Sequence, residues 1–266
     1  AINADRAAGR KPICVIGSAG TVNTGAIDAL AALAELCRRE DLWFHVDGAI
    51  GAVAVLAECI KPRLAGMEQA DSIALDLHKW MHMPFAAGCV LVRDAAAHHR
   101  AFAMAAEYLE PCERGLAGNQ ASFHEYGVQT SRQFNALKVW MTFKEHGLDR
   151  FGRLIARNVE QARALGERVR AEAELELLAP VSLNIVCFRY NPGALDDAAL
   201  NRLNREIMIR LQEEGIAALS DTTLNGCRWL RAAIVNYRSR DADFALLTSQ
   251  VLRLGRQLRL EERACF

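Results

Sequence analysis

The sequence lacks the features that mark several classes of protein. Its eight cysteines include no C-x-x-C pair, and Cys14, Cys89 and Cys187 lie in apolar, strand-like segments, where reduced thiols behave as small hydrophobic side chains. Its longest apolar stretches, 29–36 and 49–56, are too short and too rich in alanine to span a bilayer, and nothing resembles a signal peptide. We therefore expect an intracellular, cytoplasmic protein in a reducing compartment.

The chain also lacks net charge, because 32 basic residues balance 32 acidic ones. This balance gives no indication of nucleic acid or an anionic membrane as a partner. The 266 residues are 52% hydrophobic, which is enough for a large core and predicts two domains. The first residue is not methionine, and the first strand-like segment begins by Ile13, so we expect the chain to be part of a longer polypeptide.

Strand-like and helical segments alternate in the first hundred residues. A helix is predicted over 24–40, with Thr24 as its N-cap, and the strands are predicted at 12–18, 41–47, 71–76 and 88–93. This alternation predicts right-handed crossovers and a mostly parallel sheet that is covered on both faces.

The alternation of strand-like and helical segments ends after residue 100. Residues 101–130 are polar and rich in glycine, with no clear period, which is typical of a long functional loop. A helix is predicted from 130–147, with Ser131 as its cap, and it continues or restarts to about 173. The remainder predicts a smaller α/β unit, with strands at 183–190 and 229–236 and helices at 197–215 and 241–260.

Polar residues follow three of the predicted strands, in the segments 17–21, 45–51 and 76–79. Ligands bind outside the carboxyl ends of the strands in open parallel sheets, so we expect Asp47 and Lys79 to face one crevice. Pyridoxal phosphate (PLP) needs such a pair, since the amine forms a Schiff base with the aldehyde and the carboxylate keeps the pyridine nitrogen protonated. Taken alone, an aspartate such as Asp47 at a strand end is usually a turn or cap residue, and a lysine such as Lys79 after a strand is usually a surface residue.

A metal site is not predicted. His78 and His82 have the i, i+4 spacing of a metal-binding pair, but no glutamate completes an H-E-x-x-H motif, and Pro84 disfavours a helix there.

The combination of motifs resembles one family. "HVDGAIG", "DLHKW" with Lys79 placed 32 positions after Asp47, and "TSRQFNALKVWMTFKEHG" resemble the group II PLP-dependent amino-acid decarboxylases. The similarity runs from about "VIGSAGT" to "LRAAIVNYRSRD" and favours the aromatic-L-amino-acid branch. It implies an α/β fold of the aspartate-aminotransferase-like type (fold type I), comprising the C-terminal part of the large domain and the small C-terminal domain.

The resemblance also implies roles for individual residues. Lys79 corresponds to the Schiff-base lysine, Asp47 to the partner of the pyridine nitrogen, and Ala49 to a small residue against one face of the ring. His78 corresponds to a histidine near the reacting nitrogen and the phosphate. Thr21, or equally Val22, corresponds to a residue near the phenolic oxygen of the cofactor, and Asp76 to an asparagine near the phosphate. Because a carboxylate repels that dianion, we expect Asp76 to point away or to bond through its backbone.

Tyr108 stands 29 positions after Lys79, where the family carries a tyrosine on a mobile loop that closes over the site. The resemblance implies that its hydroxyl returns a proton to the α-carbon after carbon dioxide leaves, which favours decarboxylation over oxidative aldehyde formation. Without the resemblance, a tyrosine packed in an irregular loop is the simpler interpretation.

These expectations define a domain plan and a function. Residues 1–132 form part of the PLP-binding domain, with a mobile loop at about 101–127, residues 133–175 form connecting helices, and residues 176–266 form the small domain. The predicted function is decarboxylation of an L-amino acid, with an aromatic substrate favoured. An aldehyde synthase, a lyase and a non-catalytic partner of a split enzyme remain alternatives. The N-terminal part that family members carry is not visible in this sequence, so we expect either a truncated chain or one that works with another chain carrying that part. The resemblance separately implies a homodimer.

Overall fold

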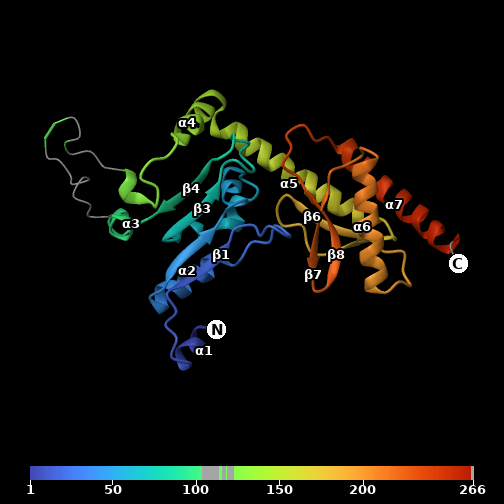
Figure 1. Ribbon diagram of the computed structural model, residues 1–266, viewed down its shortest axis with the longest axis horizontal. Coiled ribbons are helices and arrows are strands. Elements are labelled where there is room, and N and C mark those ends of the chain that lie inside the picture. The colour runs from blue at the N-terminus through green and yellow to red at the C-terminus, as the bar shows by residue number, and fades with distance from the viewer. Residues whose placement is uncertain (104–113, 116–117, 119–122, 265–266) are drawn as a thin grey trace.

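The computed structural model describes residues 1–103, 114–115, 118 and 123–264, and it contains two four-stranded sheets in two lobes. A long helix, α5 (Leu148–Ala171), runs between the lobes (Figure 1). No helix in the described part of the chain is both long enough and apolar enough to cross a membrane.

The first sheet has the order β1-β2-β3-β4. Its strands are β1 (Cys14–Ser18), β2 (Trp43–Asp47), β3 (Ser72–Asp76) and β4 (Gly88–Val92). The first three are parallel, as predicted, whereas β4 runs antiparallel to β3. The 11 residues between β3 and β4 explain this direction, because a parallel connection needs a crossover of about a dozen residues or more. Between β2 and β3 the chain forms three 3-10 turns, η1 (Ala52–Leu56), η2 (Lys61–Leu64) and η3 (Met67–Gln69).

Helix α2 (Leu30–Glu40) covers one face of this sheet and begins six residues later than predicted. Its buried residues Leu30, Ala34 and Cys37 recur at helical spacing, and Gly17 of β1 lets Leu30 approach the strand closely. Thr24 does not cap the helix. Residues 19–27 instead form a hairpin-like loop closed by an isolated bridge between Ala19 and Ile27, and this loop uses the backbone that the helix would need.

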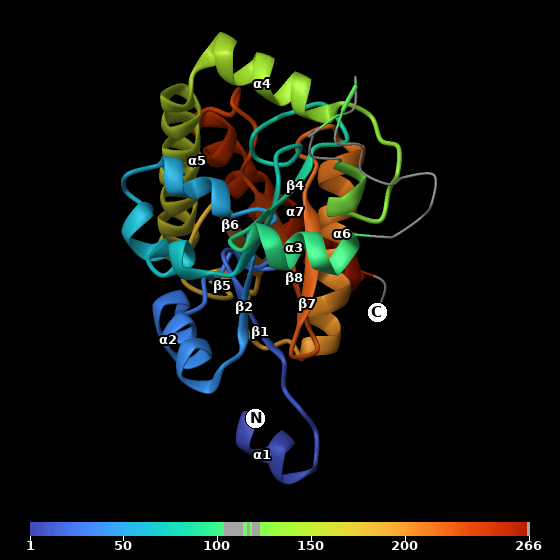
Figure 2. The same ribbon diagram turned by 90° about the vertical axis from the view of Figure 1, so that its left-hand side faces the viewer.

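Helices α3 (Ala95–Phe102) and α4 (Asn135–His146) lie near the first sheet, whereas α1 (Ile2–Ala7) projects away from it, before the start of β1 (Figure 2). Asp94 caps α3 by accepting hydrogen bonds from Ala96 N and Ala97 N. Helix α4 begins at Asn135, so the predicted start near 130 and the cap at Ser131 were wrong. A short 3-10 turn, η5 (Phe123–Tyr126), contacts α3.

The second sheet is antiparallel throughout, with the order β5-β6-β8-β7. Its strands are β5 (Leu175–Leu177), β6 (Ile185–Tyr190), β7 (Ser220–Leu224) and β8 (Cys227–Ala233). Helices α6 (Asp197–Glu213) and α7 (Asp241–Ala264) accompany this sheet, close to their predicted ranges.

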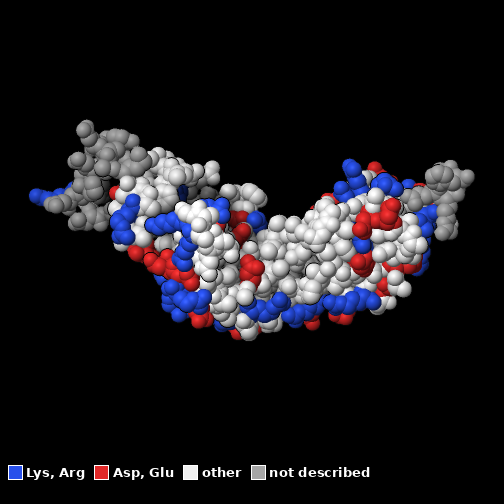
Figure 3. Space-filling model, turned by 90° about the horizontal axis from the view of Figure 1, so that it is seen from below, with Lys and Arg blue, Asp and Glu red and all other residues white. Residues whose placement is uncertain are grey.

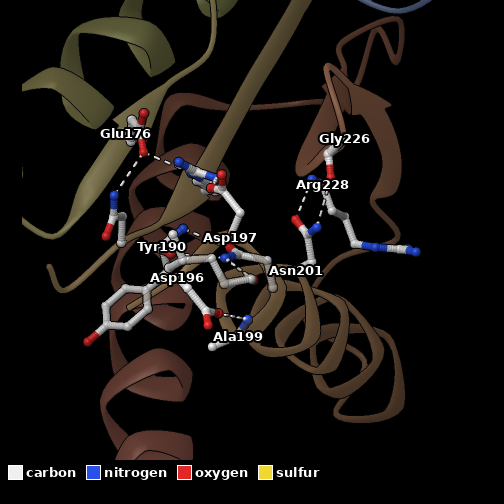
Figure 4. A network of polar contacts seen from close by, with 12 residues as sticks. Glu176, Tyr190, Asp196, Asp197, Ala199, Asn201, Gly226 and Arg228 are labelled. Atoms are coloured by element: carbon white, nitrogen blue, oxygen red, sulfur yellow. Dashed lines mark hydrogen bonds and ion pairs between the residues drawn. The ribbon is translucent and has the colours of Figure 1, made fainter. Parts of the chain in front are cut away.

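Buried polar contacts fix this second lobe (Figure 4). The side chain of Arg189 is only 8% exposed and donates to Glu176 Oε2 at 2.8 Å and to Asp197 Oδ1 at 3.2 Å. Its guanidinium also lies 4.4 Å above the ring of Trp229. A buried charge needs such pairing, because leaving it unpaired would be strongly destabilising.

Candidate functional site

The carboxyl ends of the parallel strands bring the predicted site residues together on one face of the first sheet. Ser18 pairs with Asp47, and Asp47 pairs with Ala74, which lies two residues before Asp76. Because side chains alternate between the faces of a strand, Asp47 and Asp76 project from the same face. Lys79 follows three residues after Asp76, so the predicted amine and carboxylate do lie at one edge of the sheet.

Asp47 ends β2 with its side chain exposed to solvent. Its Oδ1 accepts a hydrogen bond from Ala49 N at 3.1 Å, which fixes the carboxylate at the start of the turn. The turn lies tightly against the end of β1, since a Cβ atom on Gly51 would come within 2.0 Å of Ala19 O. Gly48 and Gly51 therefore serve close packing of the turn, since a Cβ atom on Gly48 would likewise lie 2.3 Å from Ala52 Cβ.

Lys79 lies on a hydrogen-bonded turn directly after β3. Its backbone N donates to Asp76 O at 3.1 Å, and its carbonyl accepts from His82 N at 3.2 Å. The side-chain Nζ lies 2.7 Å from Asp76 Oδ2, and the two side chains are 42% and 28% exposed. The carboxylate of Asp76 is therefore the counter-ion of Lys79. The expectation that Asp76 points away from the cofactor phosphate, or bonds through its backbone, stays a prediction.

The residue after the lysine anchors this turn. Trp80 is 1% exposed, and its Nε1 donates to Oδ1 of the buried Asn158, on α5, at 3.0 Å. Asn158 Nδ2 in turn donates to Gln161 Oε1 at 3.2 Å. In the H-K-W motif, the partly exposed amine of Lys79 is thus followed by a buried, hydrogen-bonded indole. The fixed position of Trp80 restricts where the backbone of Lys79 can lie.

His78 is oriented by the loop that returns to β4. Its Nδ1 accepts from Ala87 N at 3.1 Å, and its ring centroid lies 4.2 Å from that of Phe85. Since Nδ1 is an acceptor, the neutral imidazole carries its proton on Nε2. His82 stands four residues later, and burial lowers the pKa of its imidazole. Within the described ranges, no group of three or more His, Cys, Asp or Glu side chains is placed so that it could hold a metal ion.

Thr21 lies in the hairpin-like loop of residues 19–27. Its hydroxyl is 3.1 Å from that of Thr24 and accepts from Ala26 N, also at 3.1 Å. The alternative residue, Val22, exposes 64% of its surface, and its carbonyl is bonded to Arg231 of the second sheet. The Thr21 hydroxyl thus stabilises its own loop in this structure.

The sheet face that carries Asp47 also holds polar residues that the sequence analysis missed. Ser72 Oγ accepts from Trp43 Nε1 at 2.8 Å and lies 2.7 Å from His45 Nδ1. The signal was available, because His45 stands two residues before Asp47 and strand alternation places both on one face. Several apolar side chains on this face are also exposed, with Ile16 at 64% and Val90 at 54%.

Tyr108 lies outside the described residues, as does most of the predicted loop at 101–127. The described segments on either side of it lie together, because His99 Nε2 on α3 is 3.3 Å from Glu125 Oε2 on η5. Beside them, a depression of about 530 Å³ is lined in part by Trp43, Phe102 and Arg132. Figure 3 shows a broader hollow between the lobes, where uncharged residues predominate.

These groups have the chemistry that PLP requires. An exposed primary amine can form a covalent bond with the aldehyde, and an exposed carboxylate on the same face can pair with a protonated ring nitrogen. Residues Lys79 and Asp47 thus fit the cofactor, and both are held by short backbone turns at the sheet edge.

Comparison with known proteins gives consistent similarities. The family described as "Pyridoxal-dependent decarboxylase conserved domain" matches residues 1–191. The aromatic-L-amino-acid decarboxylase of Bacillus atrophaeus is 36% identical over 258 residues, which cover 97% of this chain and 54% of that protein. The L-2,4-diaminobutyrate decarboxylase of Rhizobium meliloti (strain 1021) is 36% identical over 231 residues, covering 87% of this chain and 46% of that protein.

Among solved structures, Oryza sativa TDC with PLP and tryptamine superposes with a TM-score of 0.88 at 26% identity. The superposition covers 97% of this chain and 53% of that one. The chain therefore spans about half the length of the proteins it matches.

Proposed function

Because the chain belongs to the pyridoxal-dependent decarboxylase family, we propose that it provides the covalent lysine and the ring-nitrogen carboxylate of a PLP-dependent amino-acid decarboxylase. The observation that carries this proposal is the placement of Lys79 and Asp47 on one face at the carboxyl ends of parallel strands. Such an edge is where ligands bind in open α/β sheets.

When bound, PLP would supply an electron sink that accepts the electron pair left as carbon dioxide departs. Lys79 Nζ would hold the cofactor covalently, and the Asp47 carboxylate would keep a proton on the pyridine nitrogen. Ala49 would pack against one face of the ring. His78 would present its Nε2–H toward the cofactor, since its Nδ1 is occupied by Ala87 N.

Two further residues are assigned more specific tasks. Asp76 would position Lys79 Nζ, and it would accept the proton that the ammonium must lose before its nitrogen can hold the cofactor covalently, because the two groups form an ion pair at 2.7 Å. Tyr108 would deliver a proton to the α-carbon of the substrate, and closure of the loop at about 101–127 would exclude water. The backbone near Thr21 and Val22 would approach the phenolic oxygen.

For the substrate we propose an aromatic L-amino acid, which is supported by 36% identity over 97% of the chain to the Bacillus atrophaeus protein. The Rhizobium meliloti relative acts on L-2,4-diaminobutyrate, so that amino acid is the comparison substrate. We further propose that the working enzyme is a homodimer, or an assembly with polypeptide corresponding to the rest of the relatives' length.

The first experiment identifies the lysine to which PLP binds covalently. The purified chain is mixed with PLP, its visible absorption is recorded, and borohydride reduction followed by peptide mass spectrometry identifies the modified lysine. Lys79→Ala is compared with Lys61→Ala, because Lys61 is also an exposed lysine in an i,i+3 ion pair, with Glu58 at 3.4 Å.

The expected result is a visible absorption band that survives Lys61→Ala and disappears in Lys79→Ala. Amine formation is then measured with tryptophan, tyrosine and L-2,4-diaminobutyrate, and an aldehyde product would instead indicate a synthase. Modification spread evenly over several lysines, or centred on Lys61, would refute the assignment of Lys79. Cofactor binding without any product would favour the non-catalytic partner.

A further inference from the structure

The hairpin-like loop that carries Thr21 is closed by hydrogen bonds among residues 20, 21 and 24–26, and none of the loop's own hydrogen bonds reaches residues 22 and 23. Thr21 N donates to Ala26 O at 2.8 Å, and Gly25 N donates to Thr21 O at 2.8 Å. At the start of the loop, Ser18 N donates to the carboxylate of Asp28 at 2.7 Å. The tip, residues 22–24, extends away from the first sheet toward the second lobe (Figure 1).

The second sheet holds this tip through polar contacts. Arg231 on β8 donates from Nε to Val22 O at 2.8 Å, and Cys187 on β6 donates from Sγ to Asn23 O at 3.1 Å. Arg231 Nη1 also donates to Ser220 Oγ on β7 at 3.2 Å, which orients the guanidinium. The side chain of Val22 remains 64% exposed, so burial of that side chain does not hold the tip in place.

The strand that carries Arg231 is itself rigidly supported. Asn201 on α6 accepts from Arg228 N at 2.6 Å and donates to Gly226 O at 2.9 Å, which ties the β7–β8 hairpin to the helix (Figure 4). Arg228 lies on the same strand and forms an ion pair with Asp221, with no contact to the 19–27 loop among its hydrogen bonds. Arg231 is thus a charged donor on a fixed strand, aimed at a loop of the other lobe.

We propose that Arg231 is a positioning residue that holds the Thr21 loop at the cofactor site, so that the second sheet determines the geometry of that site. The guanidinium acts on the backbone carbonyl of Val22 and does not itself touch the cofactor. This assignment rests on the proposed function in one respect, namely that the Thr21 loop borders bound PLP. The claim that Arg231 orders the 19–27 loop does not depend on PLP, because it follows from the hydrogen bonds described above.

The test compares Arg231→Met with the matched variant Arg228→Met, which removes a guanidinium from the same strand. Hydrogen–deuterium exchange is measured on peptides covering 19–27 without cofactor. In Arg231→Met we expect exchange of the loop amides to be roughly ten- to a hundredfold faster, the range that corresponds to loss of a hydrogen bond from a charged donor. Arg228→Met should leave these amides unchanged.

The second measurement is the dissociation constant for PLP, from titration of the visible absorption. It should rise in Arg231→Met by up to the same factor, with unchanged far-UV circular dichroism, and should stay constant in Arg228→Met. Arg231→Lys, which keeps the charge but loses the Nε donor, should show most of the effect and controls for misfolding. Unchanged loop exchange in Arg231→Met, or an equal increase in Arg228→Met, would overturn the proposal. Failure of the wild-type chain to bind PLP would instead count against the proposed function, since the exchange data do not depend on the cofactor.

Discussion

Replacing Asn158 with leucine would leave the indole N–H of Trp80 buried without a partner. Trp80 is 1% exposed and Asn158 is 2% exposed, so water cannot substitute for the lost acceptor. Leucine has the same branched shape as asparagine, but it cannot accept from Trp80 at 3.0 Å or donate to Gln161 Oε1 and Asn236 O, as Asn158 Nδ2 does. A buried donor left unsatisfied costs about 1–3 kcal/mol, and we expect the free energy of unfolding to fall by at least that amount.

The reciprocal change, Trp80→Phe, leaves the asparagine oxygen unpaired and adds a small cavity, so its cost should be similar or larger. In the double variant neither polar partner remains, and its cost should be smaller than the sum of the two single costs by about 1 kcal/mol. The assay is urea unfolding followed by far-UV circular dichroism. Trp140→Phe is the control, because Trp140 is 60% exposed and should change the stability by less than about 0.5 kcal/mol.

Additive single costs, or single costs no larger than that of Trp140→Phe, would refute this account of the anchor. A confirmed coupling would show that the turn carrying Lys79 is tied energetically to helix α5, which supplies Asn158.

Three other perturbations test separate parts of the structure. Gly51→Ala should destabilise the chain by about 1–3 kcal/mol in urea unfolding, because the new Cβ would meet Ala19 O at 2.0 Å. Burial raises the pKa of the Cys187 thiol from 9.0 to about 11, so its contribution to stability is present below pH 9.0 and is lost as the pH rises toward about 11. The difference in free energy of unfolding between wild type and Cys187→Ala should therefore shrink by up to about 2 kcal/mol between those pH values. A difference that stays constant with pH would contradict the claim that burial raises the pKa of this thiol. Asp76→Asn should change the free energy of unfolding by less than about 1 kcal/mol, since the ion pair with Lys79 is partly exposed; a larger loss in thermal or urea unfolding would assign it a structural role.

Much of the fold could be predicted from local pattern. The apolar segments at 12–18, 41–47 and 71–76 became β1, β2 and β3 within two residues at each end, because each is a short apolar run of strand-forming residues. The similarity to solved structures also confirms the fold type I class. The short strands β5 and β7 were missed, since β5 has only three residues and β7 is the polar segment "SDTTL".

The predicted starts of two helices were wrong, and the structure gives a physical cause for one of them, α2. Helical periodicity predicted starts at residues 24 and 130, but helices α2 and α4 begin at Leu30 and Asn135. For α2, the backbone groups before Leu30 are used by the 19–27 loop, whose tip is held by a strand some two hundred residues away. Such long-range competition leaves no mark on local sequence.

The candidate site was predictable in position but not in detail. Spacing and resemblance gave Asp47 and Lys79, whose strands adjoin in the sheet. The pairing of Asp76 with Lys79 depends on a turn geometry that sequence does not specify, and the contact from Arg231 depends on how two lobes meet. The cofactor and catalytic roles assigned to the site residues all stay predictions, namely those of Lys79, Asp47, Ala49, His78, Thr21, Asp76 and Tyr108.

Helix α5 belongs to two cores at once. Its first half contributes Phe151, Ile155 and Val159 to the core of the first lobe, and its second half contributes Ala162, Leu165 and Val169 to that of the second. A polypeptide cut between the lobes would leave one fragment with half of a helix whose apolar stripe has no cover. The chain should consequently melt in a single cooperative transition, and recombination of modules from related enzymes should succeed only where the crossover point keeps this helix whole.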